Sequence, residues 1–108
     1  MNIKEAYLAK ENQARIRDRL FLCLKKEFIG EIELGKLMGI GSTTIHRFIH
    51  NEDVGYKVLP KIEAFVIKME LAHETGISLE NISSGKISSA EWTELTHAAA
   101  RLMDKDNC

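Results

Sequence analysis

The feature that most constrains the fold is the segment Gly39-Ile40-Gly41, which separates two short stretches of helical periodicity. Apolar residues on both sides recur at spacings of three and four, which is typical of amphipathic helices. Gly39 can adopt a positive φ at little cost, so the chain can turn sharply there. Gly35 has no side chain, which would let the second helix approach the first closely. These residues predict two short helices joined by a tight turn.

The chain before this turn has one apolar stripe at helical spacing and no strict apolar–polar alternation. It predicts a helix over about 14–28, with Phe28 as the last residue of the buried stripe. The residues from Ile3 to Ala14 either continue this helix or form a separate short one. Basic residues at three alternate positions of the helix could contact phosphate, but we expect them on a solvated face: Arg15, Arg17 and Arg19.

After the turn, Pro60 suits the first turn of a helix over about 59–74, where its missing N–H costs nothing. Gly76 can take the left-handed conformation that stops such a helix. The segment 77–82 predicts a short turn whose apolar side chains pack back into the core. The whole chain therefore predicts an all-α fold.

The C-terminal part predicts a flexible joint over 83–86 and a last helix from Ser88 to about Met103. Ser88 and Glu91 have the spacing of a capping box. Five residues would share one apolar face of this helix: Trp92, Leu95, Ala99, Leu102 and Met103. This face either packs on the same domain or forms a dimer interface, where Trp, Leu and Met side chains are favoured.

Length and composition indicate a soluble globular protein. The chain has 108 residues, enough for one domain, of which 44% are apolar and 29% charged. Its longest apolar run, Leu20 to Leu24, is far too short to span a membrane. Residues 1–5 lack the apolar region of a signal peptide. We therefore expect a cytoplasmic protein with no membrane interaction, whose two cysteines, Cys23 and Cys108, are reduced.

The charge is distributed unevenly along the chain. Residues 1–50 carry nine Lys/Arg and six Asp/Glu, a net charge of +3, whereas residues 51–108 carry six and ten, a net charge of −4. The total of −1 does not by itself indicate a nucleic-acid binder. A mildly basic first half and an acidic second half fit a division between a DNA-facing end and a part with another role.

The second helix beside the turn has a polar face without acidic residues. Its expected exposed residues are Ser42, Thr43, Thr44, His46, Arg47 and His50. Arginine can bind the two acceptor atoms of guanine, and Ser/Thr hydroxyls can donate, accept or touch a thymine methyl. An acidic side chain on this face would be repelled by phosphate. The face therefore predicts contact with DNA bases.

Two motifs together resemble a known family. Leu34-Gly35-Lys36-Leu37-Met38-Gly39-Ile40 followed by Thr44-Ile45-His46-Arg47 resembles the helix-turn-helix of the lambda-repressor-like (Cro and XRE-type) family. The segment Gly76-Ile77-Ser78-Leu79-Glu80-Asn81-Ile82 is similar to the stretch that closes that family's core. The resemblance covers roughly Arg15 to Ile82. It implies a helix-turn-helix DNA-binding domain over 1–82, with its motif at about 31–50, and an added joint and C-terminal helix over 83–108.

The family places the second motif helix in the major groove of double-stranded DNA. Carried over by position, Ser42, Thr43 and Arg47 would face bases, with His46 adjacent. Candidate phosphate contacts are His50, Asn51, Lys57 and Lys61. The resemblance also implies a homodimer on a pseudo-palindromic operator, so the expected function is transcription regulation, most simply as a repressor.

The sequence departs from the family pattern at several places. The first motif position, often a phosphate-binding glutamine, is Glu31, and the fifth, usually alanine, is Gly35. Glu52 and Asp53 lie in a loop where basic residues are common. The alternative function is therefore a phage or antitoxin-type interaction protein that uses the same fold to bind a protein partner.

Other chemistries have little support in the sequence. His46 and His50 have the i,i+4 spacing of a zinc pair, but position 47 is Arg, so the H-E-x-x-H motif is absent, and no third ligand is evident nearby. No nucleophile–base arrangement, paired carboxylates or phosphate-binding glycine loop is present. We therefore expect no metal, no cofactor and no enzymatic activity.

Overall fold

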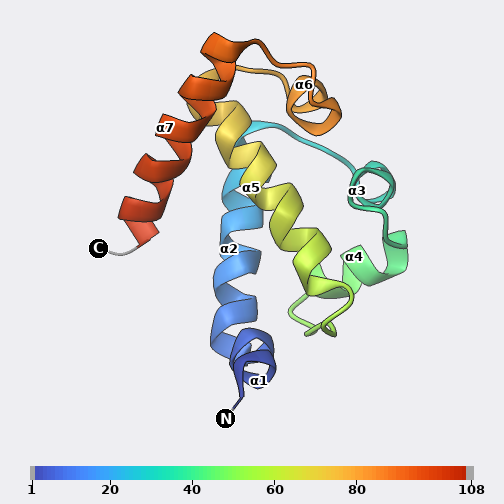
Figure 1. Ribbon diagram of the computed structural model, residues 1–108. Helices are drawn as coiled ribbons and strands as arrows, with labels where there is room; N and C mark the ends of the chain where they lie inside the picture. The colour runs from blue at the N-terminus through green and yellow to red at the C-terminus, as the bar shows by residue number, and fades with distance from the viewer. Residues whose placement is uncertain (1, 107–108) are drawn as a thin grey trace. The chain divides into compact units, whose positions relative to one another are not determined.

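The computed structural model describes residues 2–106, and within them the protein is all-α, as the sequence predicts, with seven helices and no strand. The helices are α1 (Ile3–Leu8), α2 (Lys10–Lys26), α3 (Glu31–Met38), α4 (Ser42–Ile49), α5 (Leu59–Thr75), α6 (Leu79–Ser84) and α7 (Ser89–Asp106) (Figure 1). The described chain divides after Val66 into two compact units, and this division falls within α5.

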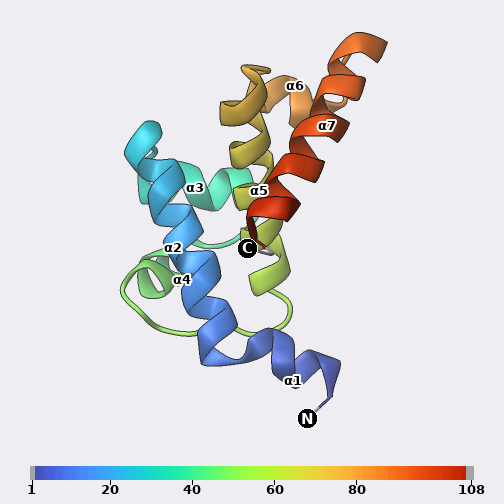
Figure 2. The same ribbon diagram turned by 90° about the vertical axis from the view of Figure 1, so that its left-hand side faces the viewer.

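The N-terminal residues form a separate short helix, which settles the alternative that the sequence left open. Asn2 caps the start of α1, because its side chain accepts a hydrogen bond from the backbone N–H of Glu5 at 2.8 Å. Ala9 is extended (φ −60°, ψ 148°), so the chain changes direction between α1 and α2 (Figure 2). α2 then starts at Lys10, earlier than predicted, and carries the buried residues Ile16, Leu20 and Cys23.

The prediction that Phe28 ends the buried stripe of this helix is wrong. α2 ends at Lys26, and Glu27 is extended (φ −146°, ψ 108°). The helical register is therefore lost before residue 28, and the Phe28 side chain is 90% exposed. Cys108, the second cysteine of the sequence, lies outside the described residues.

The expectation of a solvated Arg17 is also wrong, because α2 buries two polar side chains against the end of α4 and the loop after it. Arg17 is 6% exposed, and its guanidinium donates to the carbonyl oxygens of Phe48 and Glu52. The Gln13 side chain donates to the carbonyl of Val54 at 3.0 Å and accepts from its N–H at 2.8 Å. Arg15 remains exposed, as expected, and bonds to Asn12 at 2.9 Å.

The second unit begins with the last turns of α5, which Gly76 ends in a left-handed conformation (φ 78°), as predicted. The segment expected to form a turn over 77–82 contains most of α6, and Ile77 is buried. Ser88 caps α7, and its capping box with Glu91 is confirmed by two reciprocal hydrogen bonds of 3.0 and 3.2 Å. The described part of the chain holds no helix of the length and apolarity needed to traverse a bilayer.

The predicted apolar face of α7 is divided between buried and exposed residues. Leu95 is 5% exposed, and Ala99 and Leu102 are half-buried. Trp92 and Met103 are 64% and 65% exposed. Whether this face forms a dimer interface therefore stays a prediction, with Trp92 and Met103 as its exposed part.

Candidate functional site

The turn between α3 and α4 has the geometry that its glycines predict. Gly39 is left-handed (φ 74°, ψ 34°), and its N–H donates to the carbonyl oxygen of Gly35. The N–H of Ile40 donates to the same oxygen at 2.9 Å. Gly41 is extended (φ −69°, ψ 145°) and precedes the first residue of α4. Three residues therefore end one helix and start the next (Figure 1).

Gly35 allows α4 to approach α3, as predicted from the sequence. A Cβ atom built on Gly35 would lie 2.7 Å from the carbonyl oxygen of Ile40 and 3.3 Å from the backbone nitrogen of Ser42. Both neighbours are backbone atoms, so no side-chain rotation can relieve the contact. Any larger residue at this position would push the start of α4 away from α3.

Apolar side chains from both helices hold the pair in the core of the first unit. Leu34, Met38, Ile45 and Phe48 are buried, and Ile40 in the turn is half-buried. These five residues anchor the two helices. Because the apolar side chains of α4 face inward, its polar side chains must face outward.

The end of α4 is held by the side chain of Arg17. The guanidinium of Arg17 donates to the carbonyl of Phe48 and stacks over the phenyl ring, with 4.5 Å from Cζ to the ring centre. It also lies 3.5 Å from a carboxylate oxygen of Asp53. A positive charge is favourable at a helix C-terminus. Asn51, two residues after the end of α4, adopts a left-handed conformation (φ 72°) that asparagine tolerates better than most residues.

The outward face of α4 carries most of the predicted base-reading residues. Ser42, Thr43, His46, Arg47 and His50 are exposed, whereas Thr44 is half-buried. The eight residues of α4 include no acidic side chain. These groups therefore present two hydroxyls, two imidazoles and one guanidinium on one short helix and the residue that follows it.

Two acidic side chains from outside α4 reach this face. Oε1 of Glu31, the first residue of α3, lies 3.0 Å from Nδ1 of His46. Oε2 of Glu52 lies 3.9 Å from Nε of Arg47, and both of these side chains are exposed. The contact between Glu31 and His46 was not predicted, because the two residues are 15 positions apart and meet only when the turn closes.

His50 joins Glu31 and His46 in one cluster. The two imidazole rings lie 4.2 Å apart between their centres and are tilted by 48°. One oxygen of Glu31 and one nitrogen of each histidine lie within 4.8 Å of one another. The sequence showed the histidine pair but not the carboxylate that completes it.

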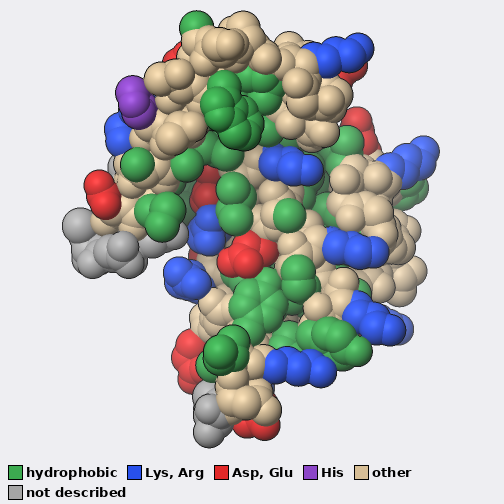
Figure 3. Space-filling model, in the orientation of Figure 1, with side chains coloured by type: hydrophobic (Ala, Val, Ile, Leu, Met, Phe, Trp, Pro, Cys, Tyr) green, Lys and Arg blue, Asp and Glu red, His purple; other side chains and the backbone are tan. Residues whose placement is uncertain are grey.

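The predicted phosphate contacts Asn51, Lys57 and Lys61 are all exposed. The ammonium of Lys61 lies 3.5 Å from the carbonyl oxygen of Gly39, next to the turn. Figure 3 shows Lys and Arg side chains over the side of the molecule where α3, α4 and the start of α5 lie in Figure 1. Basic side chains are therefore present beside α4, although Glu31 and Glu52 reduce their electrostatic effect.

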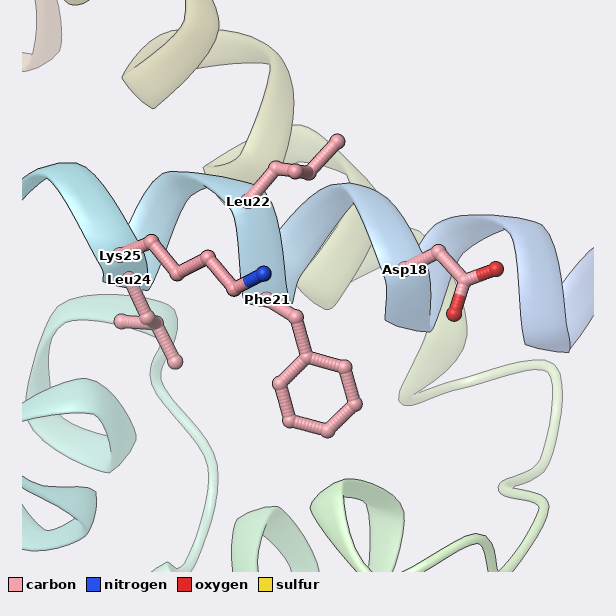
Figure 4. Close-up of a pocket in the computed structure, with 5 residues that line it drawn as sticks. All are labelled: Asp18, Phe21, Leu22, Leu24 and Lys25. Atoms are coloured by element: carbon pink, nitrogen blue, oxygen red, sulfur yellow. The ribbon is translucent and has the colours of Figure 1, made fainter.

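A separate pocket lies on the surface of α2, away from the turn in the sequence. It is lined by Asp18, Phe21, Leu22, Leu24 and Lys25 (Figure 4). Figure 4 shows that Phe21 and Leu22 point to different sides of the helix. The residues that line this pocket include one carboxylate and one amine but no nucleophile next to a base. The pocket therefore gives no reason to assign an enzymatic reaction to the protein.

Comparisons with known proteins do not add to this description: no protein-family model, no curated protein and no solved structure matches the chain. The functional inference therefore depends on the geometry of α3, the turn and α4.

Proposed function

We propose that this protein is a sequence-specific DNA-binding transcription regulator, with α3 and α4 as a helix-turn-helix of the lambda-repressor-like kind. α4 would lie in the major groove, as recognition helices of such motifs do. One observation carries the proposal. α3 and α4 approach closely at Gly35, and the outward face of α4 has no acidic residue.

The chemistry of that face matches the requirements of base recognition. Arg47 can donate two hydrogen bonds to guanine, and Ser42 and Thr43 stand at the start of α4, the end of a recognition helix that enters the groove. The pair of Arg47 with Glu52 is long and exposed, so releasing the guanidinium toward a base costs little. His50, Asn51, Lys57 and Lys61 would contact phosphates around the groove.

A homodimer would double the DNA site and offset the modest positive charge of one chain. α7 supplies the candidate surface, because Trp92 and Met103 are large, apolar and exposed. A dimer with two-fold symmetry would recognise an inverted repeat. Occupying such a site at a promoter would make the protein a repressor.

The test is a selection of the purified protein against a random DNA duplex library, with Arg47→Ala treated in parallel. We expect an enriched inverted repeat, and we expect the variant to lose preference at one base pair in each half-site. Failure of both proteins to enrich any sequence at low salt would refute the proposal.

The alternative function is protein binding through the same surface, and the acidic contacts favour it. Glu31 and Glu52 place carboxylates against His46 and Arg47, where a DNA-binding surface would gain from their absence. Salt dependence separates the two functions. DNA binding weakens with salt in proportion to the phosphates contacted, and we expect a slope of about −3 to −5 in log K against log salt concentration. Capture of one protein partner, with no DNA enrichment, would support the alternative.

A further inference from the structure

We propose that Glu31, His46 and His50 form a binding site for a divalent transition-metal ion of the zinc class. The three side chains come from the first turn of α3, from α4 and from the residue that follows α4, and their ligand atoms lie within 4.8 Å of one another. This inference depends on these side chains alone and not on the proposed DNA binding.

The ligand set is the type that zinc accepts. Zinc binds imidazole nitrogen at about 2.0–2.1 Å and carboxylate oxygen at similar lengths, most often with four ligands in a tetrahedron. Tetrahedral ligands at that distance are separated by roughly 3.4 Å. The pair of Glu31 and His46 is already at 3.0 Å, so small side-chain rotations would bring all three groups to one ion. Water would take the fourth position.

The two histidines are prearranged for this role by the backbone. His50 follows the last residue of α4, and its backbone N–H still donates to the carbonyl oxygen of His46 at 3.1 Å. The two residues therefore lie on the same face, one turn apart, and their rings are 4.2 Å apart between centres. The carboxylate of Glu31 belongs to α3, on the other side of the turn. A hydrogen bond between Glu31 and His46 accounts for the approach of that pair, but it does not require a second imidazole beside it.

The site is open to solvent, so an ion can reach it without unfolding the protein. The side chains of His46 and Glu31 are 58% and 40% exposed, and His50 is exposed. A bound ion would link the start of α3 to α4 and thereby hold the turn closed. Binding to the folded state alone raises its stability with metal concentration.

The nature of the ligands predicts which ions bind. Two imidazoles favour zinc, cobalt or nickel over magnesium, which prefers oxygen ligands and retains its water. Excess Mg²⁺ should therefore not displace Zn²⁺. Displacement of Zn²⁺ by Mg²⁺ would show a nonspecific attraction to acidic side chains and would overturn the proposal.

The experiment is calorimetric titration of the full chain with Zn²⁺ after removal of metals with a chelator, accompanied by the visible spectrum of bound Co²⁺. We expect one ion per chain, a Co²⁺ spectrum of tetrahedral type and a higher melting temperature with Zn²⁺. His46→Ala and His50→Ala should each weaken Zn²⁺ binding by about tenfold or more. Even the loss of a residue that only hydrogen-bonds to a metal ligand weakens metal binding about 10–100-fold. Glu31→Gln should weaken it as well.

His97→Ala is the matched control, because His97 is an exposed histidine on α7 and should leave binding unchanged. All four substituted residues lie at the surface or partly exposed, and circular dichroism verifies that the variants fold. Equal Zn²⁺ affinity in the wild type, His46→Ala and His50→Ala would place any bound ion elsewhere and overturn the proposal, as would the absence of binding to the wild type.

Discussion

A Cβ atom on Gly35 would lie 2.7 Å from the carbonyl oxygen of Ile40, which makes glycine the residue that fits at the crossing of α3 and α4. We therefore expect Gly35→Ala to lower the free energy of unfolding by about 2 kcal/mol. Overpacking costs about 1–3 kcal/mol, and we expect the upper end of this range because both close neighbours are backbone atoms. The higher helix propensity of alanine offsets about 1 kcal/mol of that cost. Urea denaturation followed by circular dichroism measures the difference.

Gly55→Ala is the control for this prediction, because a Cβ on Gly55 meets no atom within 4 Å and its φ is not positive. It should change the free energy of unfolding by less than about 0.5 kcal/mol. A Gly35→Ala variant as stable as the wild type would mean that the two helices are not held at this distance in solution.

Arg17 should contribute to stability far more than its neighbour Arg15. Arg17→Met keeps the length of the side chain but removes the donors to the carbonyls of Phe48 and Glu52. We expect a loss of about 2–3 kcal/mol, because buried carbonyl groups lose charged hydrogen-bond partners. Arg15→Met, on the exposed side of α2, should cost less than about 0.5 kcal/mol. Equal effects of the two substitutions in thermal or urea unfolding would contradict the buried role of Arg17.

Tyr7 should make the stability of the protein fall in alkaline solution. Burial of its ring and a 3.0 Å hydrogen bond from its hydroxyl to Glu63 raise the pKa of Tyr7 from 10.0 to about 12. The pKa of Tyr7 is therefore higher in the folded protein than in the unfolded chain. The stabilisation is therefore complete below pH ~10 and is lost as the pH rises from about 10 to 12.

Tyr7→Phe tests this pH dependence. Near neutral pH the variant should be less stable than the wild type by up to about 1 kcal/mol, the value of one partly exposed hydrogen bond. The two free energies of unfolding should converge as the pH approaches 12. Urea denaturation at several alkaline pH values gives both curves, and a constant difference across this range would contradict the prediction.

Arg47 and Lys57 should affect DNA binding in different ways if α4 reads bases. Arg47→Ala should cost about 1–3 kcal/mol on the selected site and relax the preference at one base pair. Lys57→Ala should weaken binding to all sequences and reduce the salt slope by about 1. Fluorescence anisotropy at several salt concentrations measures both effects. Lys86→Ala, a change in the exposed segment before α7, is the control, and a specificity change from it but not from Arg47→Ala would place recognition elsewhere.

Trp92 should determine the oligomeric state if α7 forms the dimer interface. Central tryptophans at interfaces contribute about 2 kcal/mol or more, so Trp92→Ala should raise the dimer dissociation constant roughly 30-fold. The exposed fraction of Trp92 is 64%, so the substitution should leave the fold intact. Sedimentation velocity across a range of concentrations measures the equilibrium, with Glu94→Ala as the control on the same helix. A wild-type protein that stays monomeric at every concentration would exclude this interface.

The local features of this chain could be predicted from its sequence because they depend on neighbouring residues. The turn at Gly39 and the capping box of Ser88 and Glu91 are set by backbone preferences and by contacts three or four positions apart. The close approach at Gly35 was predictable as well, because the atoms it meets, at Ile40 and Ser42, lie only five and seven positions further along the chain. The end of α2 was less so, because no breaker follows Phe28 until Gly30 and the helical pattern runs past Lys26.

The contacts that were missed join residues far apart in the chain. Arg17 is buried because its partners are 31 and 35 positions away, and periodicity along α2 carries no information about them. The carboxylate of Glu31 reaches His46 only once α3 and α4 cross. A search for metal ligands near the histidines in sequence could not find it. DNA binding, dimerisation and the assignment to a family stay predictions.

Arg17 fixes the last turn of α4 and the loop after it through the main chain, since its partners are the carbonyl oxygens of Phe48 and Glu52, which every residue type provides. Ile45 and Phe48 anchor the same helix from beneath, and Ser42, Thr43 and Arg47 take no part in either attachment. Substitution of the outward side chains of α4 should therefore leave the position of the helix unchanged. This makes the protein a suitable scaffold for redesigning what a short helix recognises.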